Sequence, residues 1–440
     1  MMRVCASLGS AGDAGSDDLA KADLVEIRTD IFASVPKNIL RRGQTGLISF
    51  KNGIRTSMVP DRNWIVDIGG ADRPDMPNTI VSSYHDFGGA PDAGTIAEIL
   101  GRMKGDIAKG AFTVNSLKDA AVLFDASVLV KKKHIIIGMG ELGRITRIRS
   151  ELLGNEFAFA YVGRETAPGQ LSVSEMAKIG GGTAVTGIIG SGIGYTRSPA
   201  MHDAAFSHSG IDGKYLVFDT PSLDRFEDFV VNYGIRGVNV TKPHKTAVMD
   251  RIGSCDPVSE AVGAVNAVVN ANGELKGYNT DVYGIEKAME RNSVDVRGKR
   301  ALIMGSGGAA RSCAYFLSEN GCDATVTGRN AVTVRRVASD LGLTARERTS
   351  VSINMYDIVI NCIPLNTDND ISEYPVKISA IDKSQTVFDM VYGKTHLNDV
   401  ARKKGCAVVP GEDMLAFQGI RSFELFTSKT IPYEVMRSAI

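Results

Sequence analysis

Short apolar runs recur at near-regular spacing along the first 180 residues of the chain. Most of the intervals between them hold helix-like stretches, and 97–107 and 117–123 are the clearest. Strand–helix alternation repeated eight times predicts a closed parallel (β/α)8 barrel of the TIM type. An open doubly wound sheet would give the same alternation and remains the alternative. The eight runs are 4–7, 23–27, 47–50, 64–67, 79–83, 112–115, 134–138 and 157–161.

Three consecutive glycines at 180–182 then interrupt the pattern. Because such a run is entropically costly to order, it suits a hinge between domains. The α/β alternation resumes afterwards and continues almost to the end of the chain. We therefore predict an α/β protein with segments 1–179, 183–281 and 282–440, and with C-terminal helices able to return to the middle segment.

Composition and charge argue against several classes of protein. The chain has 440 residues with 50 Lys+Arg against 50 Asp+Glu, so no net charge attracts it to nucleic acid or an anionic membrane. No apolar run is long enough to span a membrane, and the first residues do not resemble a secretion signal. Six scattered cysteines predict reduced thiols in a cytoplasm, with no metal site. The sequence leaves monomer and homodimer both open.

Residues 300–311 read RALIMGSGGAAR, an apolar strand followed by a glycine-rich turn and a helix. This is G-x-G-x-x-A in the strand–turn–helix setting of a Rossmann dinucleotide site. Gly305 permits the tight turn, Gly307 lets the backbone approach a pyrophosphate, and Ala310 allows the helix to pack closely. A glycine-rich turn without a ligand is the alternative interpretation.

The residue after the next strand predicts which cofactor is used. An NAD site places a carboxylate there to bind the ribose hydroxyl, whereas this chain has Arg329. A guanidinium matches a 2′-phosphate, so NADP is expected. Arg335 and Arg336, close by, read as a solvated helix face.

The middle segment carries polar residues at strand ends. In GVNVTKPHK (237–245), Pro243 is expected to start a helix, which places Lys245 unfavourably in its first turn and hints at a function. Asn266 lies inside an apolar run and needs hydrogen-bond partners. Asp281 could simply cap a helix.

Motifs in this half occur in the order RSPAMHDAAF (197–206), GVNVTKPHK, GAVNAV, YNTDVYG, GSGGAAR, DMVY and GEDMLAFQG. Together they resemble the shikimate dehydrogenase family over about 183–440. The resemblance implies that Lys245 and Asp281 transfer the proton while NADPH supplies hydride. The implied substrate contacts are Thr196, Ser198, Thr241, Asn266, Tyr392 and Gln418. The implied cofactor contacts are Gly305, Ser306, Gly307, Gly308, Ala309, Arg329 and Gly411.

Barrel enzymes place their chemistry at the carboxyl ends of strands. Alternation along 109–113 points Lys109 into the barrel, where burial and nearby cations such as Arg147 would make it a nucleophilic amine. Such an amine favours imine formation with a ketone, and His85 could take the proton that the iminium acidifies. A lysine snorkelling at a helix end is the alternative. The other candidates by position are Glu26, Arg28, Lys51, Arg147 and Gln170.

EIRTD (26–30), SFK (49–51), SYHDF (83–87), DIAKGA (106–111), GMGELGRITR (138–147) and TAPGQLS (166–172) also occur in order. They resemble the type I 3-dehydroquinate dehydratase family over about 1–175. The resemblance implies Lys109 as the Schiff-base residue and His85 as the general acid/base. It implies substrate contacts from Glu26, Arg28, Lys51, Arg147, Thr166 and Gln170.

Some positions depart from these family patterns. Lys51 replaces an arginine, which keeps the charge but loses bidentate geometry. Arg55 stands where an acidic residue orients the histidine, and Asp67 and Asp86 are the candidates to replace that carboxylate. Thr166 and Thr196 each replace a serine and keep the hydroxyl.

Together the two halves predict a bifunctional enzyme that dehydrates 3-dehydroquinate and then reduces 3-dehydroshikimate. The alternatives are an NAD-dependent quinate/shikimate dehydrogenase in a degradative route, or a barrel retained as a binding or regulatory module.

Overall fold

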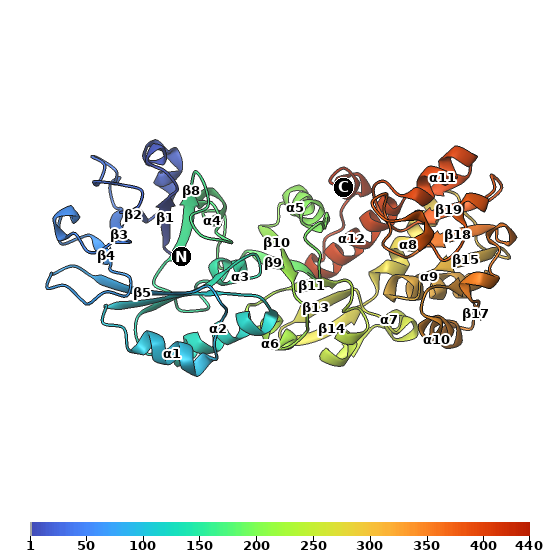
Figure 1. Cartoon of the computed structure of the whole chain (residues 1–440), viewed down its shortest axis with the longest axis horizontal. Coiled ribbons are helices and arrows are strands. Elements are labelled where there is room, and N and C mark those ends of the chain that lie inside the picture. The colour runs from blue at the N-terminus through green and yellow to red at the C-terminus, as the bar shows by residue number, and fades with distance from the viewer. Residues whose placement is uncertain (1) are drawn as a thin grey trace. The chain divides into compact units, whose positions relative to one another are not determined.

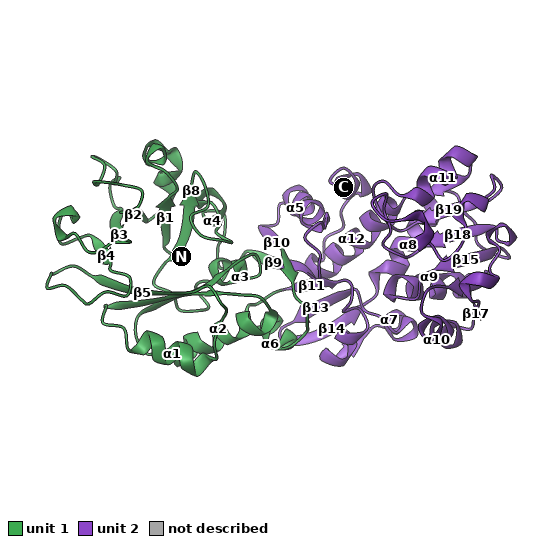
Figure 2. Ribbon diagram, in the orientation of Figure 1, with its two compact units in different colours: residues 1–185, 216–235 green, residues 186–215, 236–440 purple. Residues whose placement is uncertain are grey.

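The computed structural model describes residues 2–440 and divides them into two compact units (Figures 1 and 2). Unit 1 comprises 1–185 and 216–235, and unit 2 comprises 186–215 and 236–440. The segment 216–235 joins unit 1 because α6 (Phe226–Asn232) packs on α2 (Leu117–Leu129) of the barrel. The Tyr233 hydroxyl donates to Ala120 O (2.8 Å), and Arg225 forms an ion pair with Asp125 (2.7 Å).

Eight parallel strands form the sheet of unit 1, in the order β7-β6-β5-β4-β3-β2-β1-β8. They are β1 (Val4–Leu8), β2 (Leu24–Arg28), β3 (Thr45–Ser49), β4 (Ile65–Asp67), β5 (Ile80–Asp86), β6 (Ile107–Thr113), β7 (His134–Met139) and β8 (Ala158–Val162). All eight predicted runs overlap these strands or adjoin them. Alternate residues fill the interior with an apolar cluster that includes Cys5, Leu24, Leu47 and Ile135.

The barrel is nearly closed, because no described ladder joins β7 to β8. One side chain bridges this seam. The Asn155 carboxamide accepts from Ile136 N (2.7 Å) and donates to Ile136 O (3.0 Å). It thereby satisfies two backbone groups that would otherwise bond to a neighbouring strand.

Helices cover only the second half of the barrel, which corrects the expectation that most intervals are helical. They are α1 (Ala93–Gly101), α2, α3 (Arg144–Ile148) and α4 (Val173–Met176). Among residues 2–80, the described connections contain only turns and the 3-10 helices η1 (Ala11–Gly15), η2 (Asp17–Lys21) and η3 (Thr56–Met58). Glycine, proline and aspartate are frequent in these connections and disfavour α-helix.

A mixed sheet and then a parallel one follow along the chain, and all of their residues except 184–185 of β9 and 216–219 of β10 belong to unit 2. The mixed sheet has the order β10-β9-β11-β13-β14-β12. Its elements are β9 (Ala184–Gly190), α5 (Ser198–Ser209), β10 (Gly213–Asp219), β11 (Gly237–Val240), η4 (Ala247–Arg251), β12 (Ser254–Cys255), α7 (Pro257–Val262), β13 (Ala267–Ala271), β14 (Glu274–Tyr278) and α8 (Thr280–Arg291). A turn spans 242–246, so the helix predicted to begin at Pro243 is replaced by this turn and η4.

The second sheet is wholly parallel, with the order β17-β16-β15-β18-β19-β20. Its elements are β15 (Arg300–Met304), α9 (Gly308–Glu319), β16 (Asp323–Thr327), α10 (Ala331–Leu341), β17 (Thr344–Ala345), β18 (Ile358–Asn361), β19 (Thr386–Asp389), α11 (His396–Lys404), β20 (Ala407–Val409), α12 (Gly411–Thr427) and α13 (Tyr433–Arg437). Strand order reverses at β15, the switch point where open α/β sheets bind ligands. Helices α12 and α13 pack back onto α5, and α12 also packs on α8.

Candidate active sites

Lys109 lies inside the barrel, as the alternation along β6 predicts, and only 5% of it is exposed. Its Nζ atom is 3.2 Å from Asp67 Oδ2 and 4.2 Å from the centre of the Phe159 ring. A buried ammonium needs such compensation, because desolvation of an unpaired charge is costly. Lys109 therefore has an anionic partner, whereas the sequence suggested cations around it.

Asp67 is the centre of a small buried network. Its Oδ1 accepts from the Ser83 hydroxyl (2.8 Å) and from Gly69 N (2.9 Å). Burial opposes ionisation, but the charges of Lys109 and Lys51 outweigh it and hold the Asp67 pKa below its ordinary value. The carboxylate is thus ionised and fixed beside the amine.

His85 lies at the carboxyl end of β5 and is exposed, with its ring stacked on Phe87. Desolvation and the positive charges of Lys109 and Lys51 lower the His85 pKa to about 4. The imidazole is neutral at pH 7 and can accept a proton. Asp67 pairs with Lys109, and Asp86 accepts from Gly88 N (2.9 Å), so neither candidate carboxylate is seen to orient this ring within residues 2–440.

The remaining barrel candidates form two hydrogen-bonded groups. Glu26 accepts from the hydroxyls of Ser7 and Ser49 (2.6 Å for Ser49). Arg28 donates to Thr166 O (3.3 Å), and Gln170 Oε1 accepts from the Thr166 hydroxyl (2.8 Å). The bond from Arg28 to Thr166 therefore joins the end of β2 to the loop after β8.

Arg147 and Lys51 lie in opposite surroundings. Arg147 is buried, which lowers its pKa to about 10, and within the described residues its Nε has no hydrogen-bond partner. Lys51 is exposed, and its charge acts on both Asp67 and His85. A buried donor without a partner is costly, so Arg147 has hydrogen-bonding capacity available to an anionic ligand.

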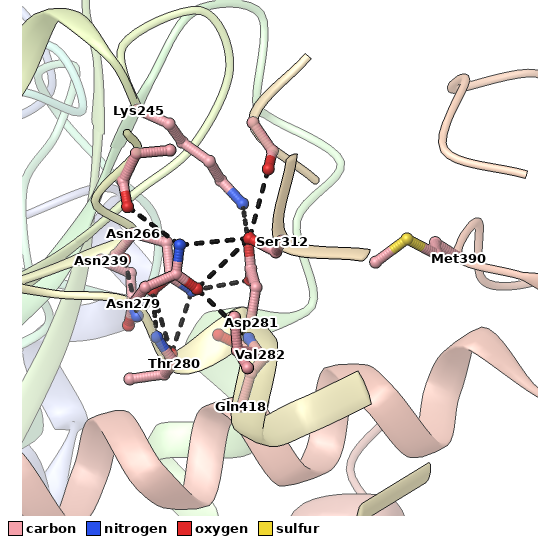
Figure 3. A network of polar contacts seen from close by, with 12 residues as sticks. Asn239, Lys245, Asn266, Asn279, Thr280, Asp281, Val282, Ser312, Met390 and Gln418 are labelled. Atoms are coloured by element: carbon pink, nitrogen blue, oxygen red, sulfur yellow. Dashed lines mark hydrogen bonds and ion pairs between the residues drawn. The ribbon is translucent and has the colours of Figure 1, made fainter. Parts of the chain in front are cut away.

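In unit 2, Lys245 and Asp281 form an ion pair at the start of α8, where Asp281 is 3% exposed (Figure 3). The other carboxylate oxygen, Oδ1, accepts from Asn266 Nδ2 (2.7 Å). One hydrogen bond joins the two groups, so the amine of Lys245 is held in a fixed position beside the carboxylate.

A buried amide and hydroxyl network holds this pair in place. Asn266 Oδ1 accepts from Thr280 N (2.6 Å), and the Thr280 hydroxyl lies 3.0 Å from the Ser422 hydroxyl. Asn239 Nδ2 also donates to Ser422 (2.7 Å). Sequence reasoning missed Asn239 and Ser422. A polar residue inside the apolar run GVNV was the available signal for Asn239, whereas nothing local marked Ser422 on α12.

A cavity of about 210 Å³ opens beside the ion pair. Candidates predicted from six separate motifs meet in its wall. The lining includes Thr196, Ser198, Thr241, Lys245, Asn266, Asp281, Tyr392 and Gln418. Hydroxyl and amide groups around one Lys–Asp pair can bind a small polyhydroxylated acid and move one proton.

The glycine-rich turn at 305–308 lies against Lys245, which lines this cavity. Gly305 has φ 120°, which only glycine adopts readily, and Gly307 is the N-cap of α9 without a side-chain cap. A Cβ at Gly307 would meet no atom within 4 Å, whereas one at Gly308 would lie 2.9 Å from Lys245 Cδ. Space is therefore open at Gly307, and Lys245 lies against the turn at Gly308.

Arg329 follows β16 and is exposed, and no hydrogen bond or ion pair of its guanidinium is found within residues 2–440. Uncapped N–H groups at α9 fit a pyrophosphate, and a free guanidinium after β16 fits a 2′-phosphate. Gly411 begins α12, where a Cβ would lie 2.5 Å from Asp389 O. The residues present therefore fit a phosphorylated dinucleotide.

Comparison with known proteins decides the family. Residues 188–268 match the shikimate dehydrogenase substrate binding domain, and 411–440 match the shikimate 5′-dehydrogenase C-terminal domain. The chain is 34% identical to "Shikimate dehydrogenase (NADP(+))" of Moorella thermoacetica over 276 residues, covering 59% of this chain and 94% of that protein. The chain belongs to the shikimate dehydrogenase family.

Other similarities agree with this shikimate dehydrogenase assignment. The enzyme of Methanopyrus kandleri is 36% identical over 59% of this chain and 95% of its own. Shikimate 5-dehydrogenase of Thermus thermophilus, solved with NADP(H) and shikimate, matches with a TM-score of 0.54 at 29% identity, over 58% of this chain and 98% of that one.

The barrel has its own match. Residues 72–180 correspond to the type I 3-dehydroquinase family model. The matched segment contains β5 to β8 and helices α1 to α4. A type I 3-dehydroquinase domain therefore precedes the shikimate dehydrogenase region in one chain. None of the described helices, within 2–440, is long and apolar enough to cross a membrane.

Proposed function

We propose that this chain catalyses two successive reactions, dehydration of 3-dehydroquinate to 3-dehydroshikimate and NADPH-dependent reduction of that product to shikimate. The observation that carries the proposal is the presence of two separate Lys–Asp pairs, Lys109–Asp67 and Lys245–Asp281, whose lysines lie in the segments that match the two families. The product of the first reaction is the substrate of the second.

In the barrel, Nζ of Lys109 attacks the substrate ketone once it has lost its proton, and water leaves to give an iminium. The positive nitrogen acidifies the adjacent carbon, and neutral His85 removes that proton. The electron pair then expels the ring hydroxyl, which takes up a proton and leaves as water. Hydrolysis of the iminium returns Lys109. Arg147, with its unpaired Nε, is suited to the substrate carboxylate.

In the dehydrogenase region, Lys245 supplies a proton to the carbonyl oxygen, and Asp281 holds its ammonium in place. Asn266 fixes the Asp281 carboxylate, while Thr196 and Ser198 have hydroxyls in the cavity for the substrate carboxylate. NADPH, when bound, supplies the hydride to the carbonyl carbon. Arg329 and the N-terminus of α9 are the groups of this chain suited to its phosphates.

Borohydride trapping tests the barrel chemistry. Borohydride reduces an imine to a stable amine, so protein incubated with 3-dehydroquinate and borohydride should gain the mass of the reduced adduct on the peptide that contains Lys109. A Lys109→Ala protein that still forms the adduct would remove Lys109 from this role. Measurable dehydratase turnover by the wild type excludes a barrel retained only as a binding or regulatory module.

Turnover of Lys245→Ala tests the second site. We expect kcat for 3-dehydroshikimate to fall by about 10²–10⁴-fold, the usual contribution of acid–base catalysis. NADPH affinity, measured by fluorescence, should change little. The dehydratase activity of the same variant is the internal control. Comparing NADPH with NADH, and 3-dehydroshikimate with quinate, separates this proposal from a degradative quinate dehydrogenase.

We further propose that the protein works in a cytoplasm. All six cysteines are free thiols, which suits a reducing compartment.

A further inference from the structure

Three sulfur atoms from separate elements meet beneath the glycine-rich turn. Cys362 Sγ, just after β18, is 3.3 Å from Met390 Sδ, just after β19, and 3.9 Å from Cys313 Sγ on α9. Cys313 Sγ is 3.6 Å from Met390 Sδ, which closes the triangle. We call these three residues the sulfur triad.

The triad connects the two parts of the dehydrogenase site. A Cβ on Gly305 would lie 3.4 Å from Cys362 Cβ, so the triad is in direct contact with the first glycine of the turn. Met390 also lines the cavity that holds Lys245 and Asp281. In Figure 3 its side chain lies apart from their network, at the right of the view. Cys313 is fully buried, whereas Cys362 is partly exposed and provides the entry side.

The chemistry of the triad selects a particular class of metal. Thiolate and thioether sulfurs are soft ligands that favour Cu(I) over Mg²⁺, Ca²⁺ or Mn²⁺. No cluster of three or more His, Cys, Asp or Glu suited to a metal occurs within residues 2–440. Cys313 and Cys362 supply two thiol ligands, and Met390 Sδ lies 3.6 and 3.3 Å from them, so its uncharged thioether would be the third ligand.

The spacing of the sulfurs is close to that of a three-coordinate site. With metal–sulfur bonds of about 2.3 Å, an ion centred among three sulfurs holds them about 4.0 Å apart. The observed separations of 3.3, 3.6 and 3.9 Å approach that value. Met390 can supply most of the remaining adjustment, because methionine is unbranched and flexible.

We propose that the sulfur triad binds one soft monovalent metal ion, Cu(I), and that the bound ion inhibits the dehydrogenase. Each thiol releases its proton to solvent as its copper–sulfur bond forms, Met390 donates a lone pair without losing a proton, and the oxidation state of copper does not change. The ion ties the base of the turn at Cys362 to Met390 in the cavity wall, so the two can no longer adjust around cofactor and substrate.

Anaerobic titration of the full chain with Cu(I), in competition with a Cu(I)-binding dye, tests the site. The wild type should bind one tight equivalent, and X-ray absorption should find three sulfurs per copper. Cys313→Ala and Cys362→Ala each break the chelate and should weaken binding by at least about 100-fold. Cys322→Ala is the matched control, since that thiol donates to Lys299 O and does not belong to the triad.

Activity supplies an independent readout. One equivalent of Cu(I) should abolish NADPH-dependent turnover of the wild type and of Cys322→Ala, while Cys313→Ala should remain active. Dehydratase activity should be unaffected throughout. Equal copper affinity in wild type, Cys313→Ala and Cys362→Ala would overturn the site. A wild type that binds no copper in the anaerobic titration would also overturn it.

Discussion

The two central lysines each pair with an aspartate, but in different surroundings. Lys109 and Asp67 are sealed inside the barrel, with side-chain exposures of 7% and 2%. Lys245 and Asp281 line an open cavity, where the lysine side chain is 17% exposed. The amine of Lys109, which is proposed to act as a nucleophile, is thus buried. The amine of Lys245, which is proposed to transfer a proton, is partly exposed at a cavity.

The partners of the two aspartates differ in the same way. Asp67 is fixed within its own barrel by Ser83 and Gly69. Asp281 depends on Asn266 from a neighbouring segment, and this network extends to α12 near the end of the chain. The hydrogen bonds of the barrel pair therefore stay within the barrel, whereas the network around the dehydrogenase pair extends to α12.

Lys109→Ala should have the largest effect on turnover, and only on the reaction of the barrel. Loss of a covalent nucleophile should reduce dehydratase turnover by at least about 10⁴-fold. Dehydrogenase turnover of 3-dehydroshikimate should remain at the wild-type value, since no described contact of Lys109 involves that site. Separate assays of the two half-reactions measure this, and parallel loss of both activities would contradict two independent sites.

Asp67→Asn and Asp281→Asn should separate stability from turnover. Asp67→Asn leaves a buried ammonium uncompensated, which should cost about 3–5 kcal/mol of barrel stability. Asp281→Asn leaves Lys245 beside a water-accessible cavity, so it should cost little stability but reduce reduction of 3-dehydroshikimate by about 10²-fold or more. Denaturant unfolding and steady-state kinetics provide the two measurements. Equal destabilisation by both variants would contradict the expectation that burial of the Lys109–Asp67 pair makes its loss more costly.

Arg329→Ser tests the cofactor side of the dehydrogenase. A charge-assisted hydrogen bond contributes about 1.5–3 kcal/mol, so the Kd for NADPH should rise by roughly 10–100-fold. NADH, which lacks the 2′-phosphate, should bind almost as before. Arg335→Ser on the exposed face of α10 is the matched control. An equal effect of Arg329→Ser on both cofactors would remove the arginine from phosphate recognition.

His85 gives the smallest and most specific effect, on the pH dependence of the barrel. Its pKa of about 4 lies below the unperturbed value of 6.5. Because the unfolded chain binds the proton more tightly, this residue favours folding fully above pH 6.5, and that contribution is lost as pH falls towards 4. The base form should likewise sustain dehydratase kcat/KM down to about pH 4. An acid limb near pH 6.5 would contradict this.

Periodicity predicted the strands of the barrel well, because inward and outward side chains alternate on buried strands. It failed for the connections in residues 2–80, where the barrel closes without α-helices, and for the turn after Pro243. The residues that motif order singled out as substrate contacts of the dehydrogenase line one cavity in unit 2. Motif order could not find Ser422, Asn239 or the anionic partner of Lys109, because those contacts join residues far apart in sequence.

The most direct test of the account is one assay with 3-dehydroquinate and NADPH as the only added reactants. Loss of nicotinamide absorbance is expected with the wild type and with an equimolar mixture of Lys109→Ala and Lys245→Ala, but with neither variant alone. Wild-type protein that leaves NADPH unoxidised under these conditions, or a single variant that consumes it at the full rate, would contradict the claim that two lysines act in succession.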